Sequence, residues 1–127
     1  MKNILVTGGA GFIGSNLIKK LIENGYDVTS LDNYSTGNIE NQVDGAKYIN
    51  DDIENISNIK LHFDTCFHLA AQSRVQPSFD DPLESVRVNV SGTAKVMDWA
   101  KFNKSKVIYA GSSSKHHQPS ASPYAMT

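Results

Sequence analysis

The segment from Thr7 to Gly14 reads Thr-Gly-Gly-Ala-Gly-Phe-Ile-Gly and directly follows an apolar run, Ile4-Leu5-Val6. Gly9, Gly11 and Gly14 fit the spacing G-x-G-x-x-G, and Gly8, Gly11 and Gly14 fit G-x-x-G-x-x-G. Such a strand–turn–helix segment suits a dinucleotide pyrophosphate, because glycines admit the phosphates closely and the helix N-terminus offers free N–H groups. A glycine-rich turn can also be purely structural, but its place between a strand and a helix favours the phosphate site.

Asp32 ends a second apolar run, about 20 residues after the glycine turn. A carboxylate at this point can accept hydrogen bonds from both hydroxyls of an adenosine ribose, and it repels a 2′-phosphate. The following Asn33-Tyr34 brings no arginine that could bind a 2′-phosphate. The residue therefore predicts NAD rather than NADP as the ligand, although an ordinary loop or capping aspartate is the alternative.

The elements that must position these residues are strands alternating with helices, which predicts an α/β fold with a doubly wound parallel sheet of about five strands. The expected strands are Asn3–Val6, Val28–Leu31, Tyr48-Ile49, Thr65–Ala70 (apolar enough to be buried on both faces) and Lys106–Ala110. Ligands of such sheets bind beyond the carboxyl ends of the strands, where the strand order reverses. The candidate residues fall at those ends: Gly8–Gly14, Asp32, Asp52, Ala70–Ser73 and Ser112.

Helical periodicity predicts a first helix from Gly11 to about Glu23, with Gly25 as its stop. A shorter helix is expected from Ile53 to His62, and the polar stretch Asn33–Gly45 predicts a loop with a short helical turn. The apolar face of the first helix is expected to carry Ile13, Leu17 and Leu21.

A third helix is expected from Pro82 to about Phe102. Asp81 can cap it, Pro82 suits the first helical position, and Glu84 can reach back to the cap. Apolar residues then recur at helical spacing. They are Leu83, Val86, Val90, Ala94 and Met97.

Composition limits the functional classes. The chain has 127 residues, about one domain, and a net charge of −1, which gives no electrostatic support for nucleic-acid binding. No apolar run approaches the length of a membrane span, and Cys66 lies in an apolar run as a small buried residue. We therefore expect a soluble cytoplasmic protein. His62 and His68 are expected to be packing residues, and the adjacent His116-His117 point apart in a loop, so no metal site is expected.

Several segments of the sequence, taken together, resemble the extended short-chain dehydrogenase/reductase family, in particular the NAD-dependent nucleotide-sugar epimerases and dehydratases. The resemblance covers essentially the whole chain. It rests on Thr7–Gly14, Asp32-Asn33, Asp52-Ile53, His68-Leu69-Ala70-Ala71-Gln72, Asn89-Val90-Ser91-Gly92-Thr93, Tyr109–Ser114 and Ser122-Pro123-Tyr124. It implies a Rossmann NAD-binding fold.

The resemblance also implies roles for the matched residues. Phe12 and Ile13 would line the pyrophosphate turn. Asn89 would support the active-site loops from the central helix, the one expected over residues 82–102. The remaining cofactor contacts follow from the same match: Asp32, Asn33, Ser35, Thr36 and Gly37 at the adenosine ribose, Asp52 and Ile53 at adenine, and Leu69, Ala70, Ala71, Gln72 and Ser73 beneath the nicotinamide half.

Ser112 matches the active-site serine of the family, with Ser113 or Ser114 as alternatives if the loop register differs. Tyr124 matches the tyrosine of Tyr-x-x-x-Lys, which acts as the general base, but the chain ends at Thr127, one residue before the lysine. Lys115-His116-His117 also stands where epimerases usually have Val-Tyr-Gly. The resemblance therefore implies the incomplete front part of an enzyme, residues 1–127 forming a dinucleotide-binding domain without its substrate-binding part.

In such an enzyme, Tyr124 and Ser112 would act on a hydroxyl of a nucleotide sugar, UDP-sugars first among them, and hydride would pass transiently to NAD through a keto-sugar. The serines at 112–114 include no acidic pair for eliminating water, which favours epimerase over dehydratase. Reductase and decarboxylase relatives, and a non-catalytic dinucleotide-binding module, stay open as alternatives. A structural domain without a cofactor would need the glycine turn and Asp32 to be coincidental.

Truncation would also leave a surface uncovered. The helix that follows Tyr124 in the family lies beside the helix over residues 82–102, so the Val86/Val90/Met97 stripe should be partly exposed. We expect self-association through this helix, as a homodimer, or reduced stability. A monodisperse, thermostable monomer would contradict this expectation.

Overall fold

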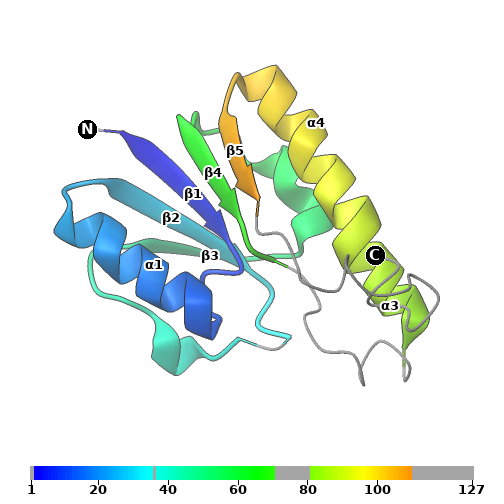
Figure 1. The fold of residues 1–127 in the computed structure, drawn as a ribbon, viewed down its shortest axis with the longest axis horizontal. Coiled ribbons are helices and arrows are strands. Elements are labelled where there is room, and N and C mark those ends of the chain that lie inside the picture. The colour runs from blue at the N-terminus through cyan, green and yellow to red at the C-terminus, as the bar shows by residue number, and fades with distance from the viewer. Residues whose placement is uncertain (1, 36, 71–80, 110–127) are drawn as a thin grey trace, which may run out of the picture.

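The structure, a computed structural model, describes residues 2–35, 37–70 and 81–109, and of Ser85 only the backbone. It contains one parallel sheet of five strands in the order β3-β2-β1-β4-β5 (Figure 1). The strands are β1 (Asn3–Thr7), β2 (Asp27–Asp32), β3 (Lys47–Asn50), β4 (Thr65–His68) and β5 (Lys106–Tyr109). The predicted doubly wound sheet is confirmed, and its strand order reverses between β1 and β4.

Helices cover both faces of this sheet (Figure 1). The helix α1 (Phe12–Glu23) packs through Ile18 and Leu21 on Ile4 and Val6 of β1, and forms one core layer. The other layer carries the 3-10 segment η2 (Ile53–Asn58) and the helix α4 (Thr93–Asn103). Its buried residues are Leu5, Leu31, Ile53, Ile56, Phe63, Cys66, Val96, Trp99 and Ala100.

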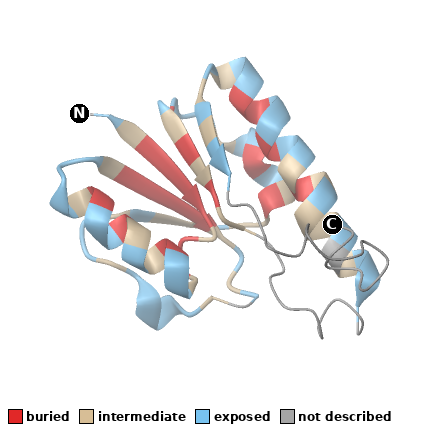
Figure 2. Ribbon diagram, in the orientation of Figure 1, coloured by how far each residue is buried: buried red, intermediate tan, exposed pale blue. Residues whose placement is uncertain are grey.

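Burial is greatest in β1 and β2, whose inner residues are buried on both faces (Figure 2). The prediction that strand 65–70 is buried on both faces is wrong. The strand β4 ends at His68 and alternates between half-buried and buried residues, because the second face is only partly covered there. Cys66 is fully buried as predicted, and this burial raises the pKa of its thiol to about 12.

The first helix begins and stops as predicted, with Gly11 at its N-cap and Gly25 at a φ of +85° after its last turn. Its buried face is shifted from the predicted one: Ile18 and Leu21 are buried and Leu17 is half-buried, whereas Ile13 is 70% exposed. The predicted loop 33–45 does contain a short helical turn, η1 (Ile39–Asn41). The expected helix 53–62 is only the 3-10 segment η2, which stops at Asn58.

The predicted helix over residues 82–102 consists of three joined pieces: α3 (Pro82–Val86), the π-helical segment η3 (Arg87–Gly92) and α4. Asp81 caps it as predicted, with its Oδ1 accepting the N–H of Glu84 at 3.1 Å. Within the described residues, the carboxylate of Glu84 makes no hydrogen bond to the cap; its two oxygens accept from Arg87 instead.

The apolar stripe of this helix is not its buried face. Val86, Val90 and Met97 are 45%, 47% and 42% exposed, which confirms the expected partly uncovered stripe. The residues that face the core are instead Gly92, Val96, Trp99 and Ala100. A π-helical turn holds more residues than an α-helical one, so the face that points to the sheet shifts along η3.

Candidate functional site

The glycine turn joins β1 to α1 at the point where the strand order reverses. Gly8 has a φ of +75°, and a Cβ there would lie 2.9 Å from the backbone N of Ala70. A Cβ at Gly14 would lie 2.2 Å from the carbonyl oxygen of Gly8. Gly11 differs, because its φ is −78° and its nearest contact would be 3.4 Å away. The fold therefore requires glycine at positions 8 and 14, whereas only a closely approaching ligand would require it at position 11.

The first turn of α1 offers unused hydrogen-bond donors. The first N–H groups of a helix have no partner inside the helix. Gly11 is the N-cap and has no side chain, no described side chain caps this helix, and no acidic residue lies in its first turn. Such a helix end attracts an anion through its N–H groups and its dipole. The turn therefore has the properties of a pyrophosphate cradle.

Asp32 lies at the end of β2, directly beside this turn. Its Oδ2 accepts the backbone N–H of Ala10 at 2.9 Å, and its Oδ1 accepts that of Tyr34 at 2.7 Å. A carboxylate has about four acceptor positions, so two remain for hydroxyl groups of a ligand. The carboxylate is thus held by the backbone on both sides and stays able to accept further hydrogen bonds.

The loop after β2 is seated on the same turn. The backbone N–H of Asn38 and the side-chain amide of Asn41 both donate to the carbonyl oxygen of Ala10, at 3.2 and 2.9 Å. A Cβ at Gly37 would lie 2.8 Å from the Cβ of Ala10. The predicted ribose loop and the predicted pyrophosphate turn therefore do lie together.

Asp52 follows β3 and faces this loop. It accepts hydrogen bonds from Asn33 Nδ2 at 3.2 Å, from the backbone N–H of Glu54 at 3.0 Å and from Arg87 at 2.8 Å. Burial, the largest single influence, raises the pKa of Asp52, but the hydrogen bonds from Arg87, Glu54 and Asn33 outweigh it and leave the pKa below its usual value. The carboxylate is therefore ionised at neutral pH.

The end of β4 is tied to β1 and α4 through His68. Thr7 Oγ1 lies 2.7 Å from His68 Nδ1, and His68 Nε2 lies 2.9 Å from Thr93 Oγ1. Thr7 Oγ1 also accepts the backbone N–H groups of Leu69 and Ala70, at 3.0 and 3.1 Å. These two donors use both acceptor positions of the hydroxyl, so Thr7 donates to Nδ1 and His68 carries its proton on Nε2.

This arrangement fixes the backbone of Leu69 and Ala70 beside Gly8. His68 is 3% exposed, as expected of a packing residue, and burial lowers its pKa to about 4. The corresponding prediction for His62 is wrong, because its side chain is 61% exposed and lies near Asp64 at the surface.

The burial of His68 predicts a pH-dependent stability. In the unfolded chain, His68 binds a proton near its ordinary pKa of 6.5. In the folded chain, burial lowers the pKa of His68 to about 4, so the proton binds only near that pH. Stability should therefore be full above pH 6.5 and should fall between pH 6.5 and 4, by up to roughly 3 kcal/mol. Chemical denaturation at several pH values measures this. His68→Gln should remove that part of the slope, and an identical slope in the variant would refute the assignment.

Nearly the whole sequence matches one known protein family. Residues 4–125 match the family model described as "NAD dependent epimerase/dehydratase family". The chain belongs to this family.

Individual members of the NAD dependent epimerase/dehydratase family support the assignment. A UDP-glucose 4-epimerase from Thermotoga maritima, solved with UDP-glucose, is 38% identical over 84% of this chain and 37% of its own, with a TM-score of 0.78. The enzyme of the same name from Brucella ovis, solved with NAD, is 30% identical over 99% of this chain and 44% of its own, with a TM-score of 0.89. The UDP-glucuronic acid decarboxylase 1 of Danio rerio is 32% identical over 96% of this chain and 30% of its own length. The chain thus spans less than half the length of each.

The structure of this family member brings together most of the predicted cofactor residues. The glycine turn, the loop after Asp32, Asp52 and the backbone of Leu69 and Ala70 all meet at the carboxyl ends of β1 to β4, and Asn89 lies half-buried in η3. Other predicted residues lie outside the described part of the chain. They are Thr36, Ala71, Gln72, Ser73, Ser112, Ser113, Ser114, His116, His117 and Tyr124.

Sequence reasoning missed two features of the site. Arg87, which binds Asp52, could have been paired locally with Glu84 three residues earlier, but nothing in the sequence indicates Asp52 as its second partner. The hydrogen bonds of His68 to Thr7 and Thr93 likewise join residues far apart in the chain.

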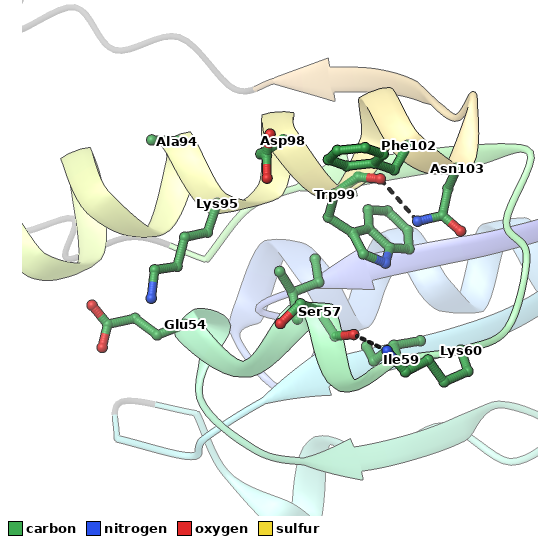
Figure 3. A pocket seen from close by; sticks show the side chains of 11 residues that line it. Glu54, Ser57, Ile59, Lys60, Ala94, Lys95, Asp98, Trp99, Phe102 and Asn103 are labelled. Carbon is green, nitrogen blue, oxygen red and sulfur yellow. Dashed lines mark hydrogen bonds between the residues drawn. The ribbon is translucent and has the colours of Figure 1, made fainter.

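A pocket of about 620 Å³ lies elsewhere, between η2 and α4 (Figure 3). Trp99 points from α4 toward Ile59 and Lys60, and its Nε1 is buried without a partner among the described residues. None of the predicted site residues lines this pocket. Among the described residues, no cluster of His, Cys, Asp and Glu could hold a metal ion, and no helix has the length and apolar character to cross a membrane.

Proposed function

We propose that this chain is the NAD-binding portion of a nucleotide-sugar epimerase that acts on a UDP-sugar. The observation that carries the proposal is the uncapped first turn of α1 beside Asp32. The first feature suits a pyrophosphate, and the second suits the adjoining ribose. The NAD in the Brucella ovis structure and the UDP-sugars named for the relatives support the same ligands.

The residues that follow β1, β2, β3 and β4 would each contact a different part of NAD. The backbone of Gly8, Gly11, Phe12, Ile13 and Gly14 would hold the pyrophosphate. Asp32, with Asn33, Ser35 and Gly37 of the next loop, would hold the adenosine ribose. Adenine would lie beside Asp52 and Ile53, and the backbone of Leu69 and Ala70 would lie below the nicotinamide half.

The backbone of Leu69 and Ala70 would hold the nicotinamide half of NAD, which would supply a reversible hydride acceptor beside the sugar carbon. Tyr124 would take the proton from the sugar hydroxyl, and Ser112 would hold that hydroxyl by a hydrogen bond. A keto-sugar would form, and return of the hydride to its opposite face would invert the centre. The reaction class is then an isomerisation.

Two alternatives have support of their own. A dinucleotide-binding module without catalysis would use the same glycine turn and the same Asp32. The similarity to a UDP-glucuronic acid decarboxylase favours a decarboxylase, and dehydratase or reductase chemistry uses the same cofactor site.

Two measurements test these proposals in sequence. Calorimetric titration with NAD should show binding to one site, and a failure to bind would overturn the cofactor assignment. An assay with UDP-glucose and UDP-galactose then separates the alternatives. Turnover by the purified 127-residue chain would contradict the binding-module alternative.

We also propose a homodimer formed through the helix over residues 82–102, and a cytoplasmic location. Leu83, Val86, Val90 and Met97 are exposed on that helix. Contiguous exposed apolar side chains of this kind mark interaction surfaces. Light scattering should show a dimer that Val90→Lys dissociates, whereas a wild-type monomer at high concentration would contradict it.

A further inference from the structure

Arg87 connects the central helix to the residues after β3. Its Nε and Nη2 donate to the two carboxylate oxygens of Glu84, at 2.8 and 2.6 Å, while its Nη1 donates to Asp52 Oδ1 at 2.8 Å. A third carboxylate, that of Glu54, lies 3.6 Å from Nη1. The forked contact with Glu84 fixes the plane of the guanidinium group, so the remaining nitrogen is aimed at Asp52.

Both oxygens of Asp52 are held. Its Oδ1 accepts from Arg87 and from the backbone N–H of Glu54, and its Oδ2 accepts from Asn33 Nδ2. Asn33 in turn accepts the backbone N–H of Ser35 at 3.0 Å. The helix is thereby linked, through one carboxylate, to the loop that follows Asp32.

The π-helical segment makes a second contact at the same place. Gly92 ends η3, and a Cβ there would lie 2.7 Å from Ile53 Cγ2. The segment η3 therefore contacts two consecutive residues after β3: Arg87 forms an ion pair with Asp52, and Gly92 packs closely on Ile53. Short π-helical segments inside longer helices are frequently found at functional sites.

We propose that Arg87 is a positioning residue for the cofactor, which orients Asp52 so that this carboxylate accepts a hydrogen bond from the 6-amino group of adenine. The inference rests on the proposed function, since it requires NAD to bind with its adenine beside Asp52 and Ile53. An ionised carboxylate accepts hydrogen bonds and cannot donate them, so it matches an amino group and repels a carbonyl oxygen. Arg87 would thus determine the base that the site accepts without touching the base.

The test compares NAD with nicotinamide hypoxanthine dinucleotide, in which a carbonyl replaces the 6-amino group. Calorimetry on the purified protein should show that NAD binds about tenfold more tightly, as expected for one hydrogen bond to a charged group. Arg87→Met should weaken NAD binding about tenfold and bring the two affinities close together. Lys101→Met is the matched control, because it removes a positive charge from an exposed position in the last turn of α4, and it should keep the preference.

Arg87→Lys is a second variant in case Arg87→Met does not fold. It keeps the positive charge but cannot donate the paired hydrogen bonds to Glu84, so its preference for NAD should fall severalfold. Circular dichroism reports folding. A folded Arg87 variant that keeps the full preference for NAD would overturn the proposal. A wild-type protein that binds both dinucleotides equally would also overturn it. A wild-type protein that binds neither would instead overturn the proposed function.

Discussion

Gly11→Ala should leave the protein folded and stable but weaken NAD binding roughly 100-fold, an affinity loss of about 2.7 kcal/mol. The residue has an ordinary φ of −78°, and its added Cβ would come no closer than 3.4 Å to the protein. In the proposed complex with NAD, that Cβ would stand where the pyrophosphate approaches the first turn of α1. Thermal unfolding and calorimetric titration measure the two effects separately.

Gly14→Ala is the matched variant and should behave in the opposite way. Its Cβ would lie 2.2 Å from the carbonyl oxygen of Gly8, which is backbone and cannot move aside. We expect a loss of about 3 kcal/mol in unfolding free energy, visible without any ligand. Unchanged NAD affinity in a stable Gly11→Ala protein would contradict the cradle, and normal stability of Gly14→Ala would contradict the packing.

Asp32→Asn should weaken NAD binding by about tenfold to 100-fold and reduce the preference for NAD over NADP. One oxygen of Asp32 holds the N–H of Ala10 in the glycine turn, and the other holds the N–H of Tyr34. An amide can accept only one of these, so one N–H loses its partner at a cost of about 1 to 3 kcal/mol. The charge that repels a 2′-phosphate is also lost.

Asp27→Asn is the control for this variant. Asp27 begins the same strand, β2, at the end opposite the site, so its substitution removes equal charge far from the cofactor residues. NADH and NADPH titrations should therefore change in Asp32→Asn and stay constant in Asp27→Asn. A wild-type protein that binds NADPH more tightly than NADH would refute the role assigned to Asp32.

The glycine turn and the carboxyl ends of the strands could be predicted because their determinants are local. The glycine spacing, the apolar run before it and the acid after β2 each constrain the backbone within a few residues, so the turn and the strand ends follow from the sequence. The sheet follows in the same way, because strands alternating with helices pair in parallel.

The rest of the site depends on contacts between distant segments. Arg87 and Asp52 are 35 residues apart, and Thr7 and His68 are 61 apart, so neither pair leaves a signal in a local pattern. The helix over residues 82–102 shows the same division. Its apolar spacing predicted the partly exposed stripe of Val86, Val90 and Met97, but not the π-helical segment η3 or the face through Val96 and Trp99 that packs on the sheet.

Backbone amide chemical shifts, followed during a titration with NAD, report directly on whether the glycine turn binds the pyrophosphate. We expect the largest changes at the amides of residues 8–14, with smaller changes near Asp32 and Asp52. Saturating NAD that leaves the amides of the glycine turn unchanged would contradict pyrophosphate binding there.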